Sequence, residues 1–322
     1  MAYAMKTSKM VEIIQRKLET TSYTQTKLLG WFKSIGNIQE IPRGMLKHTI
    51  TTLEKMEPGE VVASFSALPN NVPRFTEQTT NLLTLGAKVQ IPLQVLHQWQ
   101  GNSQIDVDLQ QIINEQMKSM ITQIDQFLAY GDSFKTPRTG DRLSAQDFAL
   151  GIFNGGTPFL AGDGEDDIMD SKGDYQSTIT NAIKALKNAG FEGDGYWIFS
   201  DTDTQAQAEL GVHQLNTYTF TNEYNAILAR KYIKAWLDSP NFTNPSGEHR
   251  IVVTNPFRNN GPDQKEKDFA YRLLQGYNLD VFPLYGGGLG PSVAYEFVVA
   301  WSGALEIINS EAIQSSGALT LT

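Results

Sequence analysis

"IDVDLQQIINEQMKSMITQIDQFLAYGD", Ile105–Asp132, is the stretch of sequence that decides the fold. Its apolar side chains recur at helical spacing and form one stripe: Leu109, Ile112, Ile113, Met117, Met120, Ile121, Ile124, Phe127 and Leu128. Proline and glycine are missing from its interior. Asp106 or Asp108 can cap its N-terminus, and Gly131 suits the left-handed residue after a helix. The pattern therefore predicts a helix over residues 106–130, roughly 35 Å long at about 1.5 Å per residue.

Downstream of this helix the chain alternates between helical and strand patterns. The expected helices cover residues 175–190, 202–210, 221–238 and 263–276, and the expected strands cover 195–200, 250–256 and 278–285. In the first of these helices Ile179, Ala182, Ile183 and Leu186 should face inward, and Asp201 should cap the second. The alternation predicts a compact α/β unit.

Strand patterns also lie on either side of the long helix. Gly59–Phe65 and Ala87–Trp99 are typical of strands, and Pro92 places the second at a sheet edge or a bulge. Ser66–Gly86, between them, is rich in turn formers and has no helical period. The three pieces predict a protruding β-arm. Val293–Ile308 alternates like Ala87–Trp99 and is expected to be a closing strand.

Composition restricts the class of protein. The chain has 322 residues, of which 40% are hydrophobic and 19% charged, as in a globular protein with one large domain or two. The net charge of -9 argues against a protein that binds nucleic acid with its whole surface. Cysteine is absent, so neither disulfides nor thiolate metal sites can form. No apolar run approaches a membrane span, and the charged N-terminus does not fit a signal peptide. We expect a soluble protein made inside the cell.

Charge is uneven along the chain. Residues 1–60 hold nine lysines and arginines against six glutamates, a net +3, which leaves -12 for the remainder. This segment, in which Thr7–Leu18 has the pattern of a short amphipathic helix, could touch an anionic partner. Scattered solvated charges are the alternative interpretation.

No motif predicts catalysis, a cofactor or a metal. The glycine cluster Gly286–Gly290 is followed by Pro291 and a strand, whereas a phosphate loop needs a Lys and a helix, so we expect a turn between domains. The acidic residues could bind a hard cation or simply be solvated; they are Asp163, Glu165, Asp166, Asp167, Asp170 and Asp174. The four histidines lie far apart in sequence without ligand spacing; they are His48, His97, His213 and His249. A nucleophile elbow is also missing.

The order of these elements resembles a known family. "LGAKVQIPLQVLHQWQGNSQIDVDLQQIINEQMKSMITQIDQFLAYGD" resembles the strand, spine helix and "GD" turn of the Hong Kong 97-type major capsid proteins of tailed viruses, whose fold encapsulins share. "DYQSTITNAIKALKNAGFEGDGYWIFSDTDTQAQAEL" resembles the start of their axial domain, and "AYEFVVAWSGALEIINSEAI" their C-terminal strand.

The resemblance implies an α+β fold with a definite division of the chain. Residues 1–58 would be an N-terminal arm and 59–90 an extended β-loop. Residues 91–174 and 291–322 would form a peripheral domain with the spine helix 106–130, and 175–290 the axial domain.

The resemblance also implies a function. The protein would be a structural, non-enzymatic capsid protein that assembles in the host cytoplasm into the icosahedral shell of a virion around double-stranded DNA. Its partners would be copies of itself in pentamers and hexamers, weakly and non-specifically held DNA, and scaffold, portal or minor capsid proteins, with no membrane. The extended loop would lie over a neighbouring subunit.

The resemblance points to four intersubunit contact residues, Pro69, Arg74, Phe75 and Glu77, although a solvated loop tip is an alternative. Because no lysine occurs between Lys55 and Lys88, assembly should be non-covalent. Two other functions remain open. One is an encapsulin shell around a cargo enzyme, and the other is an α/β metal-dependent enzyme with Mg²⁺ bound near Asp163 and Asp167.

Overall fold

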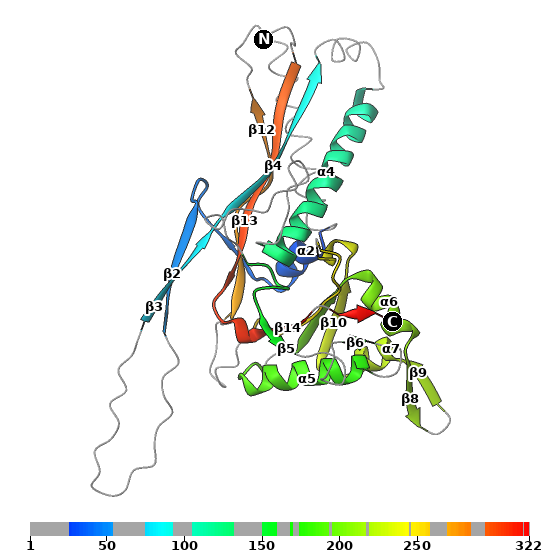
Figure 1. Cartoon of the computed structure of the whole chain (residues 1–322). Helices are drawn as coiled ribbons and strands as arrows, with labels where there is room; N and C mark the ends of the chain where they lie inside the picture. The colour runs from blue at the N-terminus through cyan, green and yellow to red at the C-terminus, as the bar shows by residue number, and fades with distance from the viewer. Residues whose placement is uncertain are drawn as a thin grey trace, which may run out of the picture.

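The computed structural model has a long sheet beside a long helix, and both join a second sheet that is covered by shorter helices (Figure 1). The structure describes residues 26–53, 75–92, 105–131, 150–159, 168–169, 174–192, 195–216, 219–244, 246–257, 269–284, 294–317 and 319–321. The predictions for Thr7–Leu18, Gly59–Phe65 and Gly286–Gly290 lie outside these residues, as do the acidic residues except Asp174.

The long sheet has the strand order β1-β12-β13-β4. Its strands are β1 (Ile38–Glu40), β12 (Tyr271–Leu284), β13 (Ala294–Ile307) and β4 (Leu83–Pro92). β13, the predicted closing strand, pairs antiparallel with both β12 and β4. β4 is the edge strand and ends at Pro92, as the missing N–H of proline predicts. β1 pairs parallel with β12 at the other edge.

The helix expected over residues 263–276 is wrong, because Tyr271–Leu284 is strand β12. Leu273 faces the main core, whereas its neighbour Leu274 packs with Ile41 and Leu82 in a separate small cluster. A strand that buries both faces loses the alternation of apolar and polar residues that identifies strands in a sequence.

The second sheet has the order β10-β7-β11-β14-β5. Its strands are β10 (Ile233–Asp238), β7 (Tyr196–Ser200), β11 (Ile251–Thr254), β14 (Ile313–Ser316) and β5 (Thr157–Phe159). The central strands β7 and β11 are buried along their whole lengths, as predicted. β14 and β5 come from outside residues 175–285, so the tertiary structure completes the unit with distant segments.

The helix expected over residues 221–238 is correct only in its first part. It ends at Leu228 as α7 (Glu223–Leu228), and Ile233–Asp238 continues as strand β10. The register of β10 against β7 shifts between Ile233 and Ala235. This irregularity spaces the buried residues Ile233 and Trp236 three positions apart, which is a helical interval.

The remaining helices cover the second sheet or connect its strands (Figure 1). They are α2 (Lys27–Ser34), α5 (Asp174–Asn188), α6 (Thr202–Leu210) and the 3-10 turns η3 (Pro240–Phe242) and η4 (Ser310–Ala312). In α5 the four predicted inward residues are all buried. Asp201 caps α6 as predicted, because its carboxylate accepts the N–H of Thr204 at 3.0 Å.

The predicted spine helix is α4 (Ile105–Tyr130), and Gly131 follows it with φ +46°. The C-terminal half of its stripe is buried in the main core: Met120, Ile121, Ile124, Phe127 and Leu128. A distant segment satisfies its last carbonyl groups. The carbonyls of Leu128 and Ala129 accept backbone N–H groups of Ile152 and Phe153, both at 2.9 Å. The carbonyl of Tyr130 accepts the side-chain amide of Asn154 at 2.7 Å.

Within the described ranges, three two-stranded ladders lie outside the main sheets. They are β2 (Lys47–Leu53) with β3 (Phe75–Asn81), β8 (Val212–Asn216) with β9 (Thr219–Asn222), and β6 (Ile168–Met169) with β15 (Thr320–Leu321). The β2–β3 hairpin projects from the body (Figure 1). The described part of the predicted strand Ala87–Trp99, residues 87–92, does not belong to a separate arm, because β4 pairs along its length with β13.

Candidate functional site

The β2–β3 hairpin has two different faces. Its register places His48, Ile50, Gln78 and Thr80 on one side, and the alternation of strands puts Phe75, Glu77, Thr49 and Thr51 on the other. We call these the inner and outer faces. On the inner face Gln78 is half-buried and Thr80 is buried. On the outer face Phe75, Glu77 and Thr79 are exposed, which agrees with this division.

The inner face is held against the long sheet by polar contacts. Nδ1 of His48 lies 2.7 Å from Oε1 of Glu306, and the side-chain amide of Gln78 donates to the carbonyl of Ile307 at 2.7 Å. Glu306 is 0% exposed, and its second oxygen accepts from Nε of Arg272 at 2.6 Å. Arg272 and Glu306 are direct cross-strand partners on β12 and β13.

The outer face presents an apolar side chain to solvent. Phe75 is 67% exposed and Glu77 is exposed beside it. Both are among the four predicted contact residues. Pro69 and Arg74 lie outside the described residues. Sequence reasoning missed the inner-face residues and Glu306. The available signal was a carboxylate near the end of the largely apolar strand β13, which also contains Glu296.

A second hairpin, β8–β9, also carries exposed apolar residues. Val212 is 61% exposed and Phe220 59%, and Leu210 at the end of α6 is 77% exposed. Val212 and Phe220 share one face of the hairpin, since Phe220 is opposite Gln214 in the register. Three neighbouring exposed apolar side chains are a feature of protein interaction surfaces.

His48 and His249 each contact a buried carboxylate, which their sequence positions did not suggest. Nδ1 of His249 lies 3.0 Å from Oδ1 of Asp201, and Asp203 completes a group of three possible metal ligands. Both oxygens of Asp201 already have partners, because Oδ1 accepts from Thr204 N and Oδ2 from Thr204 Oγ1. The group therefore has the geometry of a helix cap.

A third buried carboxylate joins α2 to the spine helix. Asp125 of α4 accepts the backbone N–H groups of Lys27 and Leu28 at 3.1 and 3.2 Å, at the positive end of α2. Burial raises the pKa of Asp125 to about 6, although these hydrogen bonds lower it. Asp125 thus holds the N-terminus of α2 against the C-terminal half of α4, the part of α4 that is buried in the main core.

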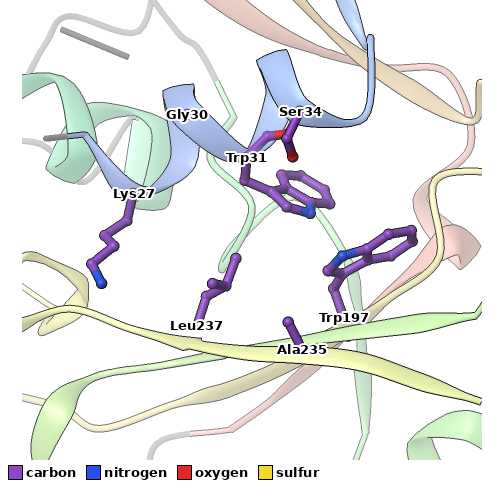
Figure 2. Close-up of a pocket in the computed structure, with 7 residues that line it drawn as sticks. All are labelled: Lys27, Gly30, Trp31, Ser34, Trp197, Ala235 and Leu237. Carbon is purple, nitrogen blue, oxygen red and sulfur yellow. The ribbon is translucent and has the colours of Figure 1, made fainter. Parts of the chain in front are cut away.

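α2 leaves a small cavity against the second sheet. Figure 2 shows the indole of Trp31 pointing from α2 towards β10, with Trp197, Ala235 and Leu237 across the gap. The cavity has a volume of about 300 Å³ and is also lined by Lys27, Gly30 and Ser34. Trp31 Nε1 is buried there without a hydrogen-bond partner among the described residues. Helix α2 therefore leaves space between itself and strands β7 and β10 of the second sheet.

Solved structures share this arrangement, whereas sequence comparison finds nothing similar. Neither a protein-family profile nor a curated protein sequence matches the chain. The capsid of Myoviridae phage XM1 is 10% identical, with a TM-score of 0.58 over 88% of this chain and 89% of that one. A virus-like particle from Pyrococcus furiosus is 11% identical, with a TM-score of 0.54 over 95% and 99%.

The fold is that of the Hong Kong 97-type capsid proteins. The same fold also occurs in the SrpI encapsulin of Synechococcus elongatus PCC 7942, which is 8% identical. That structure has a TM-score of 0.52 over 90% of this chain and 87% of the encapsulin chain. The resemblance inferred from the order of elements is therefore confirmed at the level of fold.

Within this Hong Kong 97-type fold, the candidate functional surface is the outer face of the β2–β3 hairpin. Among the described residues, this hairpin pairs through its backbone with no strand outside itself. None of the described helices has the length and apolar character that a membrane crossing requires.

Proposed function

We propose that this protein is the major capsid protein of a tailed virus and self-assembles into an icosahedral shell around double-stranded DNA. One observation carries the proposal: the projecting hairpin has its inner face tethered to its own chain and its outer face, with Phe75, exposed. The fold likeness supports it, because the capsid of phage XM1 matches over most of both chains.

Assembly would proceed through contacts between different surfaces of neighbouring copies, which close into pentamers and hexamers. Phe75 and Glu77, with Pro69 and Arg74 further along the loop, would contact the next subunit. Each contact can be weak, since a subunit in a shell makes many contacts at once. Scaffold, portal or minor capsid proteins would complete the particle, which would need no enzymatic reaction. The division into N-terminal arm, extended loop, peripheral and axial domains stays part of this proposal.

The charge distribution supports a container that holds DNA weakly. The net charge of -9 repels a polyanion, whereas residues 1–60 carry a net +3 and could face the lumen. If DNA retention by purified shells does not depend on salt concentration, this electrostatic role is wrong.

An encapsulin is the second candidate, and the match to the Synechococcus encapsulin favours it. Particle contents distinguish the two functions. Negative-stain microscopy of the purified protein should show closed shells in both cases. Nuclease-protected double-stranded DNA in particles from the natural source supports a capsid, and an enclosed enzyme supports an encapsulin. A compact monomer at high concentration in solution scattering would contradict both.

A further inference from the structure

The hairpin is joined to the body by a small apolar contact. Leu82 is the single residue between β3 and β4, and its N–H donates to the carbonyl of Leu46 at 2.9 Å. It packs with Ile41 and Leu274 in a cluster separate from the main core. A two-stranded hairpin is marginally stable without further packing. So small a cluster cannot by itself fix the direction in which the hairpin leaves the body.

Two polar contacts lie beyond this cluster on the inner face. His48 is on β2 and Gln78 on β3, so each strand has its own attachment to β13. Their acceptors, Oε1 of Glu306 and the carbonyl of Ile307, belong to adjacent residues. The separation in sequence is 258 residues for the first contact and 229 for the second.

The body side of this attachment is rigid. Glu306 sits in the β12–β13 ladder, is fully buried, and has its charge balanced by Arg272 on the paired strand. A buried carboxylate with a fixed partner keeps its orientation, because leaving an oxygen unpaired in the interior is costly. Glu306 therefore offers His48 an acceptor at a fixed position.

We propose that His48 and Gln78 form a two-point tether that sets the angle of the β2–β3 hairpin, with Leu82 as its pivot. Loss of the tether removes the two hydrogen-bonded contacts that these side chains make with β13, so the hairpin can rotate relative to the long sheet about its pivot. The outer face would then no longer be presented in one direction. The tether itself does not depend on the proposed function. Only its consequence does: in a shell, a fixed hairpin angle would match the outer face to a neighbouring subunit.

The test is a distance measurement within one copy of the chain. The absence of cysteine allows spin labels at Thr51→Cys, on the outer face, and Lys184→Cys, at an exposed position of α5. Labelled chains are diluted into excess unlabelled chains, so pulsed dipolar spectroscopy reports only distances inside one copy. The doubly labelled protein without further substitutions is the background. It is compared with the same protein carrying His48→Ala, His48→Ala/Gln78→Ala or the matched outer-face control Thr49→Ala.

We expect one narrow distance distribution for the background and for Thr49→Ala. His48→Ala should broaden or shift it, and the double variant should do so further. His48→Gln, which restores a hydrogen-bond donor, should return it towards the narrow form. Unchanged distances in a double variant whose circular dichroism is native would overturn the tether. Because the distances lie within one copy, they test the tether even if the protein forms no shells.

Discussion

At the scale of single residues, three buried carboxylates each fix an element to its neighbour. Asp125 holds the start of α2, Asp201 caps α6, and Glu306 receives the hairpin through His48. Each accepts hydrogen bonds, because a buried carboxylate oxygen without a partner would lose its hydration with no compensation. The carboxylates thus specify positions, while apolar packing supplies most of the stability.

Asp125 should make the attachment of α2 depend on pH. Its folded-state pKa of about 6 lies above the ordinary aspartate pKa of 3.8, so folding favours the protonated form. The resulting stability is fully present below the unfolded pKa and is lost as pH rises through about 6. The loss amounts to about 3 kcal/mol on these values. Hydrogen exchange of the α2 amides, corrected for intrinsic rates, should therefore be faster at pH 7 than at pH 4.

Asp125→Asn should remove this difference, because the amide has no charge to desolvate. The exposed first-turn carboxylate Asp203 offers a control, and Asp203→Asn should keep the original pH dependence. Parallel profiles for the unmodified protein and Asp125→Asn would show that Asp125 does not control the attachment.

Removal of the α6 cap should destabilise the protein without changing its fold. Asp201→Ala removes the acceptor for Thr204 N and Oγ1 and the contact with His249. The expected cost is about 1–2 kcal/mol, measured as lower resistance of the unassembled subunit to denaturant. Asp203→Ala should cost clearly less, since its side chain does not cap the helix. Equal losses in both variants would contradict the cap assignment.

At the scale of elements, residues from distant parts of the chain supply the hydrogen-bond partners at the C-terminus of α4 and at the N-terminus of α2. The carbonyls at the C-terminus of α4 are satisfied by residues 152–154, and the N–H groups at the start of α2 by Asp125. Such groups have no partner inside their own helix. The ends of these helices therefore depend on tertiary contacts as much as on local sequence.

Two glycines near these helices should respond to alanine in opposite directions. A Cβ on Gly151 would lie 2.3 Å from the carbonyl oxygen of Ala129, so Gly151→Ala must push the capping segment away from α4. Gly30 lies within α2 and lines the cavity, so Gly30→Ala should stabilise by up to about 1 kcal/mol through helix propensity. Thermal unfolding should show a lower midpoint for Gly151→Ala and a higher one for Gly30→Ala. A stabilising Gly151→Ala would contradict the close approach of the two backbones.

At the scale of the whole molecule, the β2–β3 hairpin has an inner face that contacts its own chain and an outer face that is exposed to solvent. The inner face attaches to the long sheet, and the outer face, with Phe75 exposed, would contact another copy in the proposed shell. Alternation along two paired strands achieves this without extra structure, since successive side chains point to opposite sides.

Phe75→Asp should prevent assembly while leaving the subunit folded. A charge at the centre of an apolar contact opposes its desolvation, whereas Phe75→Leu keeps an apolar group and should still assemble. Sedimentation and negative-stain microscopy measure the fraction in particles, and circular dichroism checks folding. Normal particle yields from Phe75→Asp would remove Phe75 from the proposed interface.

The sequence alone determined the elements whose signals are local. The spine helix, strand β7, the Asp201 cap and the closing strand β13 each have their period or capping residue within one continuous stretch, and their order led to the fold. Tertiary structure decided the rest. Strand β12 buries both faces, β10 contains a register shift, and the contact between His48 and Glu306 joins residues 258 positions apart. Periodicity records which side of an element is buried, but not which distant segment covers it.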